Sequence, residues 1–183
     1  ADGDHKHFRR LGTSAGRKLV FGRTFATPGG DKHRATFKLA FAADLRAPDF
    51  FAFSVQRLQM PGAAGSGLTE HANGVTGISE IIVCEPNPTD FQYFLQELTD
   101  QRETEAHSFG MEVHLENVTV NVMTPEGLNA HFGMARRTQG RGLTLKGIVF
   151  KGGMPTKGMR THGRYAIADR QAGQGAFYAF EAR

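Results

Sequence analysis

The sequence predicts a mixed fold of α-helices and β-strands in which one supersecondary unit is repeated. Three features predict it: segments with strand-like alternation, one helix with a strong apolar stripe, and a later run of strands in the same order. The 183 residues leave room for one domain, or for two small modules sharing a core. The 39% hydrophobic and 22% charged residues are typical of a folded protein.

The first part of the chain predicts the end of a helix and three strands. Residues 7–12 end in Gly12, and glycine is favoured just after a helix. Three extended segments follow, at residues 18–26, 34–43 and 50–58. The second segment alternates apolar and other residues with a period of two, which is typical of a half-buried strand. Residues 61–74, rich in glycine and alanine, are predicted to be a linker.

The clearest helix is predicted over Pro88–Arg102, after a strand at Val75–Cys84. Asn87 can cap the helix, and Pro88 suits its first position. The apolar side chains fall on one face, which we expect to pack on a sheet: Phe91, Phe94, Leu95 and Leu98.

The remaining segments predict strands and one short helix. A hairpin is predicted from residues 109–115 and 118–123, and Thr124-Pro125 begins a helix that runs to about Gly133. Strands are then predicted at residues 143–150, 162–168 and 175–180. Gly152–Gly158 lies where a crossover helix would be expected, and its glycines predict a mobile loop or a gap in the ordered chain.

Several of these segments resemble a known family. Glu70–Val83 resembles the segment that opens a βαβββ unit in glyoxalase-like proteins of the vicinal oxygen chelate superfamily. The phenylalanine-rich strand that ends at Gln56 resembles the last strand of a preceding unit. Residues 163–168 and 173–181 are similar to the closing hairpin of such a unit.

The resemblance implies an α+β fold of βαβββ units, whose curved mixed sheets form a cup. Residues 1–60 would be the C-terminal part of a truncated first unit, residues 61–74 the linker, and residues 75–140 a βαβββ-like unit. Residues 141–183 would be a final unit with a missing or shortened crossover helix.

The resemblance also implies a function, a metal-dependent lyase, isomerase or dioxygenase that acts on a small oxygenated molecule. A divalent ion, Mn, Fe, Ni or Zn, would serve as Lewis acid, with Glu80 and Glu181 as ligands. Gln56 and His71 would line the substrate pocket. Lys146 takes the corresponding first-strand position of the last unit, where a cation would repel a metal; this argues against a complete site within this chain.

The two glutamates have other interpretations. Glu80 lies among isoleucines, where acidic side chains are rare. If it shares a face with Ile78 and Ile82, its carboxylate must find a metal, a cation or water; otherwise it lies on a solvated face. Glu181 shares a face with Phe177, or belongs to a polar strand end. We expect both carboxylates to point into concave, partly apolar surfaces with too few ligands to hold a metal tightly.

Two other functions stay open. The first is a metal-free protein that binds or sequesters a small molecule in an apolar cup lined by Phe37, Phe41, Phe51 and Phe53. The second is a structural or regulatory module. No two histidines have the spacing of a helical metal site, and those at positions 107, 114 and 131 are interpreted as surface residues.

Composition limits the compartment and the partners. The single cysteine, Cys84, lies in an apolar run and is predicted to be a core residue, so a cytoplasmic location is expected. No apolar run approaches the roughly 20 residues that cross a membrane. The net charge of +4 comes from scattered residues, so nucleic acid is not expected as a partner. The expected partner is the small molecule that the resemblance implies; no membrane partner is expected, and homo-oligomerisation is left open.

Overall fold

The computed structural model describes residues 1–26, 30, 32–60, 70–134, 141–153, 158–169 and 173–181. The chain divides into two units, Ala1–Leu45 with Phe51–Glu70, and Arg46–Phe50 with His71–Arg183. The fold class is α+β, as predicted, and the larger of the two sheets is mixed. The predicted sections 75–140 and 141–183 belong to one unit, because their strands share one sheet.

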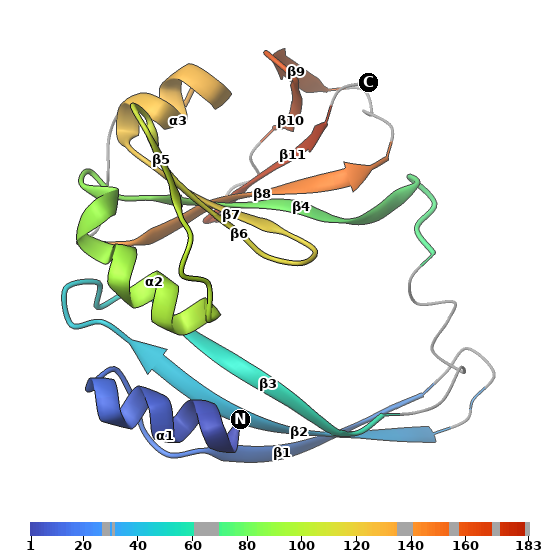
Figure 1. Cartoon of the computed structure of the whole chain (residues 1–183). Helices are drawn as coiled ribbons and strands as arrows, with labels where there is room; N and C mark the ends of the chain where they lie inside the picture. The colour runs from blue at the N-terminus through green and yellow to red at the C-terminus, as the bar shows by residue number, and fades with distance from the viewer. Residues whose placement is uncertain are drawn as a thin grey trace. The chain divides into compact units, whose positions relative to one another are not determined.

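The first unit is a three-stranded antiparallel sheet that carries one helix (Figure 1). Its elements are α1 (Asp2–Leu11), β1 (Leu19–Ala26), β2 (Lys32–Ala43) and β3 (Phe51–Gln59). The helix ends at Gly12, as predicted, and the φ of 71° there lies in the left-handed region that favours glycine. Phe8 of α1 is buried, as are Ala40 and Ala42 of β2, and together they form a small core between helix and sheet.

The opposite face of this sheet is aromatic. Phe37 stacks on Phe21 with ring centroids 5.3 Å apart, and Phe41 contacts Phe53 at 5.5 Å. Phe51 is 62% exposed and Phe53 is 50% exposed. The four phenylalanines that were predicted to line a cup therefore share one face of the sheet, because they alternate with smaller or polar residues along β2 and β3.

The second unit begins with the predicted strand β4 (Val75–Cys84). The following elements are η2 (Pro88–Phe91), α2 (Gln92–Thr99), β5 (Glu105–His107), β6 (Gly110–His114), β7 (Thr119–Met123), α3 (Pro125–Phe132), β8 (Thr144–Gly152), β9 (Met159–His162), β10 (Tyr165–Ala168) and β11 (Phe177–Glu181). The strands form one sheet in the order β5-β6-β7-β4-β8-β11-β10-β9.

This strand order contains the predicted internal repeat. In one half, β4 pairs in parallel with β7, the last strand of the meander that follows α2. In the other half, β8 pairs in parallel with β11, the last strand of a second meander. The halves join through the antiparallel pair of β4 and β8.

Each face of the eight-stranded sheet carries a helix, α2 on one side and α3 on the other (Figure 1). On the α3 face, Ile82, Phe132, Tyr165 and Phe177 are among the buried residues of one apolar cluster. On the α2 face, Phe91, Phe94 and Leu95 are buried, and Leu98 is half-buried. The predicted apolar stripe is therefore confirmed.

The structure differs from the expected elements in several places. The helix predicted over Pro88–Arg102 is a 3-10 turn followed by an α-helix that ends at Thr99, because Asp100 takes a left-handed conformation with φ of 57°. Asn87 precedes the turn, but its side chain makes no capping hydrogen bond. The short edge strands β5 and β9 were not predicted, because three or four residues show no periodicity.

Some predicted segments lie outside the described residues: residues 61–69 of the linker, and residues 154–157 of the loop after β8. Among the described helices, none is both long enough and apolar enough to cross a membrane.

Candidate functional site

Glu80 lies on β4, near the middle of the eight-stranded sheet, and is only 5% exposed. It shares its face with Ile82, as the alternation predicted, and therefore with the α3 cluster. Ile78 does not share this face. The register slips between the two residues, so Ile78 pairs with Phe150 while Glu80 pairs with Val149.

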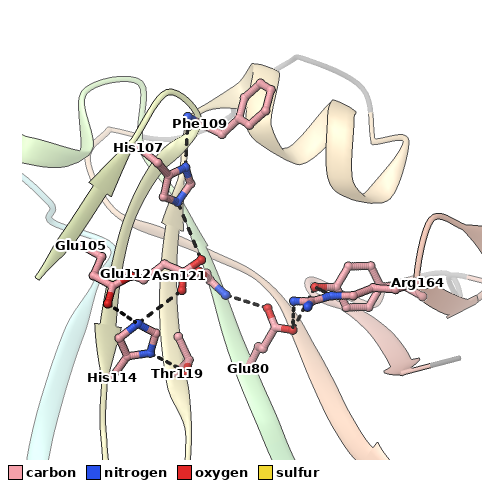
Figure 2. A network of polar contacts seen from close by, with 10 residues as sticks. Glu80, Glu105, His107, Phe109, Glu112, His114, Thr119, Asn121 and Arg164 are labelled. Carbon is pink, nitrogen blue, oxygen red and sulfur yellow. Dashed lines mark hydrogen bonds and ion pairs between the residues drawn. The ribbon is translucent and has the colours of Figure 1, made fainter. Parts of the chain in front are cut away.

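The buried carboxylate of Glu80 is held by three side chains (Figure 2). Arg164 donates from Nη2 to Oε1 at 3.0 Å, and the hydroxyl of Tyr165 donates to the same oxygen at 2.9 Å. Asn121 donates from Nδ2 to Oε2 at 2.6 Å. Both carboxylate oxygens are therefore engaged, and the guanidinium of Arg164 balances the negative charge.

The surroundings of Tyr165 and Arg164 raise the pKa of both side chains. Burial raises the pKa of the Tyr165 hydroxyl, and the charge of Glu80 raises it further. The pKa of Arg164 is raised chiefly by the hydrogen bond that its Nε donates to the Tyr165 oxygen at 2.8 Å. The negative charges of Glu80 and Glu181 raise it further. Tyr165 thus remains a neutral donor, and Arg164 remains a cation.

A second polar group lies on the same sheet face, on the hairpin of β5 and β6 (Figure 2). Glu112 lies opposite Asn121 across β6 and β7. Its carboxylate oxygens lie 3.7 Å from Nε2 of His107 and 3.6 Å from Nε2 of His114. His114 Nε2 is also 3.6 Å from Glu105.

This second group was not foreseen, because both histidines were interpreted as isolated surface residues. The signal for it was present in the sequence. Glu105 and His107 are two residues apart, as are Glu112 and His114, so a hairpin places all four side chains on one face.

The side chains around Glu80 do not fit a divalent metal. A metal needs several imidazole, thiolate or carboxylate donors, yet the neighbours of Glu80 are a cation, a phenol and an amide. Glu181 is exposed on β11 and lies opposite Tyr165. Within the described part of the chain, no three His, Cys, Asp or Glu residues are grouped to hold a metal ion. Metal ligation by Glu80 and Glu181 stays a prediction that this arrangement does not favour.

His71, the predicted substrate-binding residue, lines a pocket of about 240 Å³. The other lining residues are Asn73, Val75, Phe150 and Phe180. The two phenylalanine rings contact each other, with centroids 5.4 Å apart. Because Val149 and Ala179 point into the α3 cluster, the adjacent Phe150 and Phe180 point to the opposite face.

The loop that carries His71 is fixed by main-chain contacts. The amide of Gly74 donates to the carbonyl of His71 at 2.8 Å, and Asn73 Oδ1 accepts from the amide of Val75 at 3.3 Å. The amide of Gly153 donates to the carbonyl of Gly74 at 2.9 Å, which ties the loop to the end of β8. These contacts fix the backbone from which the His71 side chain reaches the pocket.

Gln56, the remaining predicted residue, lies in the first unit. It is exposed on β3, opposite Lys38 of β2. The four predicted residues therefore do not form one site: Glu80 and Glu181 both act on Arg164, His71 lines a pocket on the other face of the sheet, and Gln56 belongs to the other unit.

Comparison with known proteins identifies the fold but no activity. No protein-family model matches the chain. No curated protein matches it either. Among solved structures, the chain is similar to a hypothetical protein from Staphylococcus aureus, with a TM-score of 0.59 and 11% identity. The match covers 100% of this chain and 62% of that chain, so this sequence spans less than two thirds of the length of its structural neighbour.

Proposed function

We propose that this chain is a glyoxalase-like protein that binds a small oxygenated organic molecule in the His71 pocket without a metal. The observation that carries the proposal is the pocket itself, which combines an imidazole and a carboxamide with two phenylalanine rings. Small-molecule sites are typically apolar concave surfaces with a few polar groups that fix orientation.

The strand order supports the family part of the proposal. The resemblance implies repeated βαβββ units, and the large sheet contains two similar sets of strands: β4 pairs in parallel with β7, and β8 pairs in parallel with β11. The metal-free part rests on the partners of Glu80, which occupy both of its carboxylate oxygens.

The dimensions and lining of the pocket define the ligand class. About 240 Å³ is below the roughly 300–1,000 Å³ of most ligand pockets, so the ligand would be no larger than one substituted ring. Such a ring would pack against Phe150 and Phe180. Its oxygens would face His71 and Asn73, whose carboxamide still has its NH₂ group to donate.

Catechol, a ring with two neighbouring hydroxyls, is a suitable probe. We expect that titrating it into ¹⁵N-labelled protein dialysed against EDTA shifts the backbone amide signals of His71 and Asn73. His71→Ala and Asn73→Ala should each weaken binding by about three- to tenfold, the value of one hydrogen bond. His131→Ala is the matched control, because His131 packs on Phe109 and does not line the pocket.

Two outcomes would contradict the proposal. If the signals of His71 and Asn73 do not shift at millimolar catechol, the pocket is not a site for this ligand class. If catechol binds only after addition of MnCl₂ or ZnCl₂, and Glu80→Gln abolishes that binding, the metal-dependent enzyme is the better interpretation.

A further inference from the structure

The turn between α1 and β1 borders a pocket in the first unit, with a volume of about 640 Å³. His5 and Arg9 line it from α1, and Arg17 and Lys18 line it from the segment that leads into β1. The remaining lining residues are Gly12, Ser14 and Gly16. The pocket thus gathers three basic side chains and one imidazole.

The cations are not equally available to a ligand. Lys18 pairs with Asp2, which also binds Lys38 at 2.7 Å. Arg9 and Arg17 are exposed, and neither side chain has a partner among the described residues. Two guanidinium groups therefore border the pocket without a compensating carboxylate.

The glycines of the turn leave room for a ligand. Gly12 and Gly16 have positive φ angles, 71° and 77°, and a Cβ on either would meet no atom within 4 Å. The main chain there is open to close approach by a ligand.

We propose that this pocket binds the phosphate group of a small phosphorylated molecule, with Arg9 and Arg17 as its anion-binding side chains. The planar guanidinium group matches phosphate oxygens in pairs and keeps its charge at any physiological pH. The carbonyl end of α1 carries about half a negative charge, which repels an anion. The two positive charges of Arg9 and Arg17 outweigh this repulsion. The volume of about 640 Å³ has room for the organic part of a phosphate ester beside the phosphate group.

The test is calorimetric titration of the full chain with glycerol 3-phosphate, with inorganic phosphate, glycerol and sodium acetate run in parallel. We expect glycerol 3-phosphate to bind more tightly than inorganic phosphate, and glycerol and acetate not to bind. Arg9→Gln and Arg17→Gln should each weaken binding by about five- to tenfold, because each removes one charge-assisted contact. All of these side chains are exposed, so the variants should fold as the unmodified protein does.

Arg10→Gln is the matched control. Arg10 is adjacent to Arg9 on α1, but it contacts His7 at 3.0 Å and does not line the pocket. We expect it to change the affinity less than twofold. Equal losses in all three variants would mean that only net charge attracts the anion, and would overturn the proposal. If a ten-nucleotide oligothymidylate binds more tightly than glycerol 3-phosphate, the proposal is also wrong, and the pocket is part of a nucleic-acid-binding surface.

Discussion

Replacing Tyr165 by phenylalanine tests whether the polar network around Glu80 stabilises the second unit. The hydroxyl of Tyr165 donates to Glu80 at 2.9 Å and accepts from Arg164 at 2.8 Å. Its ring stacks on Phe132, with centroids 4.5 Å apart, and the residue is 2% exposed. Phenylalanine keeps that packing, so the substitution removes the hydroxyl alone.

The expected loss follows from the charge of the acceptor. A hydrogen bond to a charged group contributes about 1.5–3 kcal/mol. Arg164 and Asn121 still hold Glu80 in the variant, so we expect a loss of about 2 kcal/mol in the free energy of unfolding. Arg164→Met should cost roughly 1–2 kcal/mol, less than a fully buried pair, because Arg164 is 69% exposed.

Urea unfolding followed by far-ultraviolet circular dichroism measures both variants. With a slope of about 1–3 kcal/mol per molar urea, a loss of 2 kcal/mol lowers the midpoint by roughly 1 M. Tyr178→Phe is the control, because Tyr178 is 42% exposed and we expect a change below about 0.5 kcal/mol. If Tyr165→Phe also stays within 0.5 kcal/mol of the unmodified protein, the network does not stabilise the fold.

Four further outcomes are expected. Phe94→Ala should cost about 3–5 kcal/mol in chemical unfolding, because Phe94 is 4% exposed in the α2 stripe. Thr124→Ala should cost about 1 kcal/mol, since its hydroxyl accepts from the amide of Gly127 at the start of α3. Gly147→Ala should cost about 1–3 kcal/mol by the same assay, because the added Cβ would lie 2.4 Å from the ring of Phe177. Combining it with Phe177→Leu should restore part of this loss. Burial raises the pKa of the Cys84 thiol in the folded protein to about 11. Above pH 9 the unfolded chain loses this proton first, so the free energy of unfolding should fall as the pH rises from about 9 to 11. Cys84→Ala should reduce the slope of that fall.

Much of the fold could be predicted because its signals are local. The ends of α1 and α3 are marked by Gly12 and Gly133, both of which take the left-handed conformation there. The long strands show an alternation of two, and the stripe of α2 shows a period near 3.6. The edge strands β5 and β9 have no such signal, because pairing with a neighbour, rather than their own three or four residues, determines them.

The candidate site was less predictable because its contacts are distant in sequence. The sequence predicted that Glu80 needs a cation, a metal or water, and the structure supplies a cation. Its partners Asn121 and Tyr165 are 41 and 85 positions away. Local sequence patterns cannot identify such pairs. The pair of Glu80 and Asn121 follows only once the register of β4 with β7 is known.

The two halves of the large sheet differ in a way that accounts for the His71 pocket. Parallel strands need a connection that crosses the sheet, and the described residues between β8 and β11 form the strands β9 and β10 but no helix. Only residues 154–157 lie between Gly153 and Gly158, four positions against the eight residues of α2. Phe150 and Phe180 lie on the face that α2 covers in the first half, and Tyr178 on that face is 42% exposed. Among the described residues of the second half, no helix covers this face as α2 does in the first half, and Phe150 and Phe180 there line the pocket beside His71.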